Sequence, residues 1–549
     1  MSRKLSGTGV FGWLTVLPLS LTLGALPSRA ATLPCSEAVI QSVAPSDTTI
    51  VSATEQSDPV MYCKVLGYVT TTEPEPNQVN FELGLPAAWN GRFLFIGNGG
   101  FAGGFDIPSV FLDFNLNPFP LPTQVSAGFA AAMTDTGHQG DWLDGSWALN
   151  DLAKQNDWLL HGVHVTAVAS KAITRAFYGT ALRSYFAGCS DGGHEGLVEA
   201  EQYPADFDGI VAGDPLLGDS VIGYNWNEEH LTASAQNYIS PDKLDMVDAA
   251  VMQSCDASDG LLDGLIQDPR RCTFDPASLL CTNGSNAGCL TIGEVATLQA
   301  IYAGASTARG RQIYPGFTKS DPGEGDWAFW ITGFEPPNAP GTAEPWVDPE
   351  FPPAQFIFQD QFLKFFAFGD PNYNSLGFDP NSSDLAKAEA VIKRGGIAGT
   401  NPNLSAFRAR GGRLILYHGW SDPIFTPLET LRYYRAVVRQ QTGLRSTQQF
   451  ARLFMVPGMQ HCIASGGPGP NFFKPLPPLI DWVEKGVAPK QILGMHFKDN
   501  DPTTGIVTRT MPLCPYPEAA VFTGGDVSQA SNWKCKRQLE EDLGDDQQR

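Results

Sequence analysis

The serine at position 190 stands in a sequence that is typical of a catalytic nucleophile. Residues 188–192 read Gly-Cys-Ser-Asp-Gly, which fits the pattern Gly-x-Ser-x-Gly, and they follow directly on the apolar run 184–188. In this motif the glycines permit a sharp turn from a strand into a helix, which lifts the serine hydroxyl clear of a sheet. The pattern also arises by chance in glycine-rich chains, so its place after a predicted strand is what favours a nucleophile.

A catalytic serine needs a general base, and the base needs a group that orients it. In the fold that carries this motif, the order along the chain is serine, acid, histidine. Asp422 and His461 follow the apolar runs 414–417 and 451–456, and active sites assemble at the carboxyl ends of parallel strands. We therefore expect Ser190, Asp422 and His461 to act as nucleophile, orienting acid and base. The alternatives are a turn aspartate before a proline and an ordinary loop histidine.

The other seven histidines are in less suitable positions for a general base. His418 falls in the turn before Asp422, and His194 follows Ser190 so closely that we expect it to point into the helix. The remaining five are His138, His161, His164, His230 and His496.

The oxyanion that forms during attack by a serine needs two backbone N–H groups. One is expected from Asp191, the residue after the nucleophile. The other is expected from the loop after the apolar run 92–97, where two glycines let the backbone approach a substrate. We choose Gly100 as this donor, with Gly99 as the alternative. An ordinary glycine turn would explain the same residues.

The N-terminus is typical of a secretory signal. Arg3 and Lys4 precede a mostly apolar stretch at 11–26, and small residues follow at 27–31. We expect a signal peptide at 1–30 and a secreted or periplasmic protein. The alternative is a membrane anchor, although no other stretch approaches the roughly 20 apolar residues of a span.

The mature chain contains ten cysteines, an even number that indicates five disulfides in an exported protein. Their spacing favours three local pairs and leaves two distant ones, although the sequence does not establish the connectivity. Cys189 precedes the nucleophile and Cys462 follows the expected base, so these two must be neighbours if serine and histidine meet. The alternative is a pair of free buried thiols. The expected pairs are Cys255 with Cys272, Cys281 with Cys289, Cys514 with Cys535, Cys35 with Cys63, and Cys189 with Cys462.

The 549 residues include 58 acidic and 36 basic side chains, a formal net charge of −22. This charge argues against a nucleic acid or an anionic membrane as the main partner. It favours a neutral substrate or a cation.

The order of the predicted elements is typical of an α/β fold with a parallel sheet. A strand at 92–97, a helix at 158–178 and a strand at 184–188 form a strand–helix–strand unit. This alternation stops after 218 and returns near 401. Between them the chain is rich in loops, proline, glycine and aromatic residues.

We therefore predict an α/β-hydrolase core with a large inserted lid domain. The core has two parts, 31–218 and 401–535, and the lid is 219–400. The charged tail at 536–549 is expected to be disordered.

These residues resemble the tannase and feruloyl esterase family of α/β-hydrolases. That family joins the cysteine before its serine to a cysteine after its histidine, as Cys189 and Cys462 allow here. The resemblance runs from about Cys35 to Cys535 and implies the same serine, aspartate and histidine as the triad. The family also includes the bacterial mono(2-hydroxyethyl) terephthalate hydrolase.

The resemblance also implies a structural calcium site in the lid, within the acidic stretch 255–265. Carboxylate and carbonyl oxygens suit Ca²⁺, although the spacing is not that of an EF-hand. The alternatives are an acidic turn closed by a disulfide, or a loop that itself performs calcium-dependent hydrolysis. The implied ligands are the carboxylates of Asp256, Asp259 and Asp263 and the carbonyls of Leu261 and Leu265.

The expected function is that of a secreted carboxylic ester hydrolase that forms an acyl-serine. The substrate is a small aromatic ester of the feruloyl or galloyl type, free or attached to a polysaccharide or polyphenol. Aromatic residues of the lid could pack on its ring. The alternatives are a terephthalate half-ester hydrolase, for whose carboxylate no basic lid residue is matched, and a non-catalytic phenolic- or carbohydrate-binding protein. These lid aromatics are Trp327, Phe329, Trp330 and Phe334.

Overall fold

The computed structural model describes most of the chain after the expected signal peptide. The described residues are 32–105, 120–282, 288–320, 323, 326–347, 352–394 and 401–537. The predicted signal peptide and residues 538–549 lie outside them.

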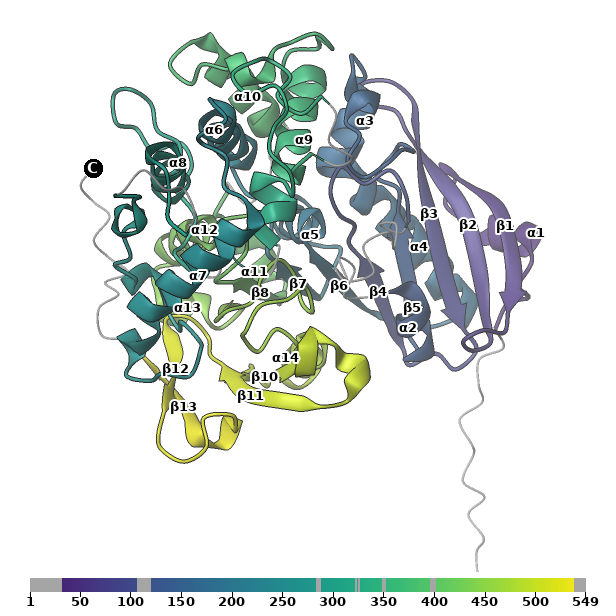
Figure 1. The fold of residues 1–549 in the computed structure, drawn as a ribbon. Coiled ribbons are helices and arrows are strands. Elements are labelled where there is room, and N and C mark those ends of the chain that lie inside the picture. Colours follow the sequence, from purple (N-terminus) through teal and green to yellow (C-terminus); the bar gives the residue numbers. More distant parts are fainter. Residues whose placement is uncertain are drawn as a thin grey trace, which may run out of the picture.

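Within these residues nine strands form one mixed sheet, in the order β1-β2-β3-β5-β4-β6-β7-β8-β9 (Figure 1). The strands β1 to β3 form an antiparallel edge, and every neighbouring pair from β5 to β9 is parallel. The bounds are β1 Thr48–Gln56, β2 Tyr62–Thr71, β3 Asn77–Pro86, β4 Arg92–Ile96, β5 Ala130–Thr134, β6 Arg183–Cys189, β7 Gly209–Gly213, β8 Arg413–Gly419 and β9 Ala451–Val456.

The burial of the strands explains why the sequence pattern predicted them. In β5 and β7 every residue is buried, whereas β2 alternates between buried and half-buried residues. Parallel strands that are covered on both faces have continuous apolar sequences, and half-covered antiparallel strands alternate. The central strands are therefore the covered core of the sheet.

Helices cover both faces of the parallel strands. Apolar side chains of α4, α5 and α12 pack on one face, and those of α2 and α14 pack on the other. The predicted helix at 158–178 is a π-helical turn, Asp157–His161, followed by α4, and it ends as predicted at Gly179, whose φ is 66°. The bounds are α1 Glu37–Val43, α2 Leu121–Ser126, α3 Leu152–Asn156, α4 Gly162–Tyr178, α5 Asp191–Gln202, α12 Pro427–Gln440, α13 Leu444–Thr447 and α14 Leu476–Lys485.

The chain leaves the sheet after β7 and returns to it at β8, with a long helical segment between. Figure 1 shows α6, α8, α9 and α10 gathered on the side of the molecule away from β10 and β11. This segment has its own apolar core, which also takes in Phe101, Trp158 and Phe425 from loops and helices of the sheet domain. Its role as a lid stays a prediction. The helix bounds are α6 Ser220–Thr232, α7 Pro241–Cys255, α8 Ile292–Ala303, α9 Ala354–Gln361, α10 Ser383–Arg394 and α11 Ser405–Ala409.

The C-terminal part forms two antiparallel ribbons, one of β10 with β11 and one of β12 with β13. Because β13 reaches Arg537 and pairs it with Glu518, the predicted start of the disordered tail at 536 is wrong by two residues. The bounds are β10 Ile492–Phe497, β11 Val507–Leu513, β12 Glu518–Phe522 and β13 Trp533–Arg537.

All ten cysteines are paired. Three of the pairs are the local ones that the spacing favours, and the other two are Cys35–Cys63 and Cys189–Cys462, the pairs that remained. Cys189 and Cys462 are joined across a sequence separation of 273 residues. No helix among the described residues is long and apolar enough to cross a membrane.

Candidate active site

Ser190 occupies a strained turn between β6 and α5. Its φ of 67° and ψ of −125° lie in a region that residues with a side chain rarely adopt. The turn is held in place because the Ser190 N–H donates to the carbonyl of Gly213 at the end of β7. A Cβ at Gly188 would lie 2.5 Å from the carbonyl oxygen of Gly192. The glycines of the motif are therefore required by the close approach of strand and helix.

Asp422 and His461 form a buried hydrogen-bonded pair. His461 Nδ1 lies 2.8 Å from Asp422 Oδ2, and the backbone N–H groups of Ile424 and Phe425 donate to Asp422 Oδ1. Burial alone would raise the pKa of Asp422, but the neighbouring histidines outweigh burial and lower this pKa. An ionised Asp422 accepts the hydrogen from Nδ1, which leaves His461 Nε2 available to take a proton.

Phe425 connects the pocket that Ser190 lines to the Asp422–His461 pair. Ser190 lines the pocket together with Phe425, whose ring also lies against the His461 ring, with the two centroids 5.4 Å apart. The Cys189–Cys462 bridge joins the chain neighbours of Ser190 and His461. A serine beside an imidazole that is hydrogen-bonded to a carboxylate would meet the requirements for nucleophilic attack on an ester.

The walls of this pocket are apolar. Asp191 is the one charged side chain among its described lining residues, and it pairs with His194 at 3.1 Å. Of the four lid aromatics named from the sequence, Trp330 reaches the His461 ring, while Phe334 is 52% exposed and none of the four lines the pocket. The lining residues are Gly100, Phe101, Trp158, Ser190, Asp191, Leu216, Val221, Tyr224, Phe358, Ile424 and Phe425.

The two expected oxyanion donors both border the pocket. Gly100 and Asp191 line it, and neither backbone N–H has a hydrogen-bond partner among the described residues. The N–H of Gly99, the alternative donor, is already engaged with the side-chain oxygen of Asn98 at 3.1 Å. Gly100 has a φ of 56°, and a Cβ there would lie 2.6 Å from the Trp142 carbonyl oxygen. Gly100 is therefore better placed than Gly99.

The oxyanion loop is held by two residues that the sequence analysis did not single out. Glu195 Oε2 accepts the backbone N–H of Asn98 at 2.9 Å, and the Asn98 side-chain amide donates to the Thr134 carbonyl. The Asn98 carbonyl in turn accepts the Gly192 N–H at 2.7 Å. The loop and the nucleophile helix are thus joined directly. The sequence held one signal for Glu195: it is an acidic residue near the start of α5, a helix whose other residues are mostly buried.

His418 lies elsewhere than predicted. It belongs to the strand β8 rather than to a turn, and it is fully buried, with its Nε2 3.2 Å from Asp422 Oδ2. The sequence analysis treated it only as a weaker rival to His461 for the same role. Its position at the carboxyl end of a buried strand, four residues before the acid, was the signal that could have indicated it.

The acidic loop at 255–265 carries the three carboxylates predicted as calcium ligands, those of Asp256, Asp259 and Asp263. The Asp256 carboxylate accepts the backbone N–H groups of Asp263, Gly264 and Leu265 at 3.1 to 3.4 Å. Asp259 Oδ1 accepts the Leu261 N–H at 2.9 Å. Both carboxylate oxygens of Asp263 are buried and accept no hydrogen bond from any residue that the structure describes.

The charge of this loop suits a hard cation. Burial, followed by the charges of Asp263 and Asp256, raises the pKa of Asp259 to about 6. A basic group lies beside the carboxylates: Arg509 of β11, whose Nη1 is 3.5 Å from Asp263 Oδ2. Oxygen donors, two of them without a hydrogen bond, fit Ca²⁺. Leu265 packs on Met511 and Trp533 of the C-terminal ribbons, and none of the five predicted calcium ligands lines the pocket.

Comparison with known proteins identifies related chains over most of the length. A sequence profile described as "Tannase and feruloyl esterase" matches residues 63–536. An uncharacterized esterase of Xanthomonas campestris pv. campestris is 35% identical, over 86% of this chain and 84% of the relative. The mono(2-hydroxyethyl) terephthalate hydrolase of Piscinibacter sakaiensis is 32% identical, over 86% of this chain and 84% of that enzyme.

A solved structure has the same fold. The crystal structure of feruloyl esterase B from Aspergillus oryzae superposes with a TM-score of 0.76 and 25% sequence identity, covering 91% of this chain and 99% of that one. The predicted α/β-hydrolase fold is confirmed.

The Cys189–Cys462 bridge should be needed to keep the nucleophile beside its base. We expect the Cys189→Ala, Cys462→Ala double variant to lose at least about 90% of its rate of Ser190 labelling by a fluorophosphonate. Its thermal midpoint should also fall. A bridge that closes a loop of this length lowers the entropy of the unfolded chain, which adds about 5 kcal/mol to the free energy of unfolding. The matched control is removal of the Cys281–Cys289 bridge, whose two cysteines are only 8 residues apart in the sequence. A folded double variant that is labelled at the wild-type rate would contradict the expectation.

Proposed function

The chain belongs to the tannase and feruloyl esterase family, and from that premise we propose that it is a secreted serine hydrolase of small aromatic esters of the feruloyl or galloyl type. Carboxylic ester hydrolysis is the activity of the family. The triad, the export of the protein and the choice of acyl group are the proposal. The observation that carries it is the buried Asp422–His461 hydrogen bond, which the Cys189–Cys462 bridge and the Phe425 ring connect to the pocket that Ser190 lines.

The proposed mechanism follows from the geometry of the pocket. Ser190 Oγ attacks the ester carbonyl carbon while His461 Nε2 takes its proton, and Asp422 stabilises the imidazolium that results. The N–H groups of Gly100 and Asp191 bind the oxyanion. The alcohol leaves with the proton from His461. A water then attacks the acyl-serine in the same way, which releases the acid and restores Ser190.

The walls of the pocket favour an uncharged aromatic acyl group. The rings of Phe101, Trp158, Phe358 and Phe425 line it, and aromatic rings pack well against each other in offset or edge-to-face contact. Its described lining residues include no Lys or Arg, so a free carboxylate would be buried beside Asp191 without a counterion. This supports phenolic esters over terephthalate half-esters.

A terephthalate half-ester remains the second candidate because of one relative, whose printed name is that of a hydrolase of this substrate. A non-catalytic binding protein is disfavoured, since a binding role has no use for an ionised acid hydrogen-bonded to a buried histidine. Export is supported by the five disulfides together with the N-terminal sequence.

We also propose that the acidic loop binds one structural Ca²⁺ ion. The carboxylates of Asp256, Asp259 and Asp263 and the carbonyls of Leu261 and Leu265 would hold it. The ion would neutralise three clustered carboxylates and tie the inserted segment to the C-terminal ribbons, which Leu265 contacts. It takes no part in the proposed reaction.

Replacing the nucleophile tests the reaction directly. Ser190→Ala should lower kcat on methyl ferulate by about 10⁴-fold or more, because the residues of a triad act as a unit. The circular dichroism spectrum and the thermal midpoint should stay close to those of the wild type. Turnover near the wild-type level would rule out Ser190 as the nucleophile.

The charge of the substrate tests the reading of the pocket. The mono- and bis(2-hydroxyethyl) esters of terephthalic acid share one acyl ring, and only the mono-ester carries a carboxylate. We expect kcat/KM for the neutral diester, methyl ferulate and methyl gallate to exceed that for the half-ester by about tenfold or more, since an unpaired buried charge is costly. A preference for the half-ester would favour the second candidate.

Removal of the metal tests the calcium site. Asp259→Ala should lower the calcium content per chain, measured by elemental analysis, and lower the thermal midpoint. Chelation of the wild type should lower that midpoint equally. Asp275→Ala, at a helix cap of the same segment outside the loop, is the matched control and should keep its calcium. Loss of activity on chelation with an unchanged midpoint would instead support a calcium ion that takes part in hydrolysis.

A further inference from the structure

Behind the triad lies a second buried histidine–aspartate pair. His418 Nε2 is 3.2 Å from Asp422 Oδ2 and 3.7 Å from Asp214 Oδ1. The side chains of His418, Asp214 and Asp422 are all 0% exposed. Burying two carboxylates and an imidazole carries a large desolvation cost, which apolar side chains would avoid. A role beyond filling the core is therefore expected for this group.

The hydrogen-bond partners of His418 establish which ring nitrogen carries hydrogen. Nε2 lies 3.0 Å from the carbonyl oxygen of Phe425, which can only accept. Nε2 must therefore be protonated, and the same N–H faces Asp422 Oδ2. On the other side of the ring, Nδ1 lies 2.7 Å from Thr430 Oγ1. Asp422 Oδ2 thus accepts hydrogen from His461 and also lies 3.2 Å from the protonated Nε2 of His418.

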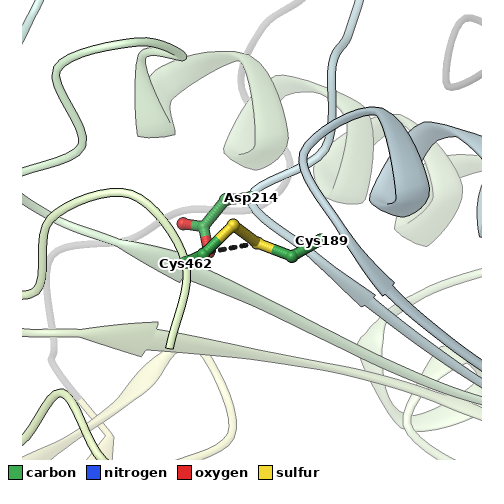
Figure 2. A group of neighbouring side chains, drawn as sticks. All are labelled: Cys189, Asp214 and Cys462. Atoms are coloured by element: carbon green, nitrogen blue, oxygen red, sulfur yellow. Dashed lines mark hydrogen bonds between the residues drawn. A yellow bond between two sulfur atoms is a disulfide. The ribbon is translucent and has the colours of Figure 1, made fainter. Parts of the chain in front are cut away.

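Asp214 connects this pair to the disulfide. Its Oδ1 accepts the N–H of Gly419 at 2.8 Å, and its Oδ2 lies 3.4 Å from Cys189 Sγ. Figure 2 shows the Asp214 carboxyl against the bridged sulfurs of Cys189 and Cys462. A sulfur in a disulfide has no hydrogen to donate, so a hydrogen bond between the two requires a proton on Asp214.

The electrostatics agree with this geometry. Burial raises the pKa of Asp214 to about 7, an effect that the nearby His418 and His461 oppose and Asp422 reinforces. Burial would lower the pKa of His418, but the charges of Asp214 and Asp422 raise it overall. Because the pKa of Asp214 is raised and that of Asp422 is lowered, the negative charge of the group favours Asp422, where the proposed general base needs it.

Taking the proposed triad as given, we propose that His418 and Asp214 are positioning residues of this hydrolase. His418 holds the Asp422 carboxylate in the orientation that His461 requires, and Asp214 ties His418 to the disulfide beside nucleophile and base. Asp214 and His418 connect the carboxyl ends of three neighbouring strands. Cys189 ends β6, Asp214 directly follows β7, and His418 lies near the end of β8. Neither residue contacts the substrate.

His418→Leu should lower kcat on methyl ferulate by about 10- to 100-fold with KM within about twofold, since a catalytic group displaced by about 1 Å can cost about 100-fold in rate. It should also move the low-field proton NMR resonance of the His461–Asp422 hydrogen bond. His418→Gln, which keeps an N–H donor, should restore most of kcat. The matched control is His164→Leu. His164 lies on α4, and its side chain pairs with Asp206 rather than with the triad. The kcat of this variant and the resonance should stay unchanged.

Asp214→Leu should lower kcat about tenfold, while Asp214→Asn, which keeps an acceptor for Gly419 and a donor for the sulfur, should retain it.

If His418→Leu does not fold, His418→Asn carries the same expectation, because its shorter amide cannot reach Asp422. A folded Leu or Asn variant of His418 with wild-type kcat and resonance would overturn the proposal, and an unchanged Asp214→Leu would remove Asp214 from it. An active Ser190→Ala would instead show that the proposed function itself fails.

Discussion

The Cys189–Cys462 disulfide is the constraint on which the candidate site depends. Cys189 ends β6, and Cys462 lies in the loop after β9. In the sheet, β7 and β8 lie between these two strands, so the loop must cross their carboxyl ends to reach Cys189. Asp214 follows β7 and Asp422 follows β8, beneath this crossing. The bridge therefore brings the ends of four neighbouring strands to one point and encloses the acid and both histidines away from water.

The segment between β7 and β8 shapes the pocket over this point. Its apolar core is continuous with Phe101 and Trp158 of the sheet domain, and it contributes Phe358 to the pocket wall. Because the segment is inserted where two parallel strands end, it lies next to the nucleophile without interrupting the sheet. Different inserted segments on the same core can thus present different pocket walls, which agrees with a family whose members carry the names of different esterases.

Buried acids surround the nucleophile helix, and they are held by specific contacts rather than by solvent. Glu195 anchors the oxyanion loop through Asn98, and Asp214 contacts the disulfide. Burial raises the pKa of both carboxyl groups, so each can remain neutral in a protein whose overall charge is strongly negative. The orientation of the loop, the bridge and the acid is then maintained by hydrogen bonds in a low-dielectric interior, where such bonds are strongest.

The sequence by itself was enough to predict the parallel core, the triad candidates and the three local disulfide pairs, and it left the connectivity of the other four cysteines open. Each of these depends on local features: a continuous apolar run predicts a buried strand, and Ser190, Asp422 and His461 are recognisable because each follows such a run. Only the tertiary structure decided that His418 contacts Asp422, that Glu195 holds Asn98, and that Phe358 rather than Phe334 lines the pocket. The physical reason is that these contacts depend on which strand ends are neighbours and which way side chains point there, and residue spacing along one chain carries neither.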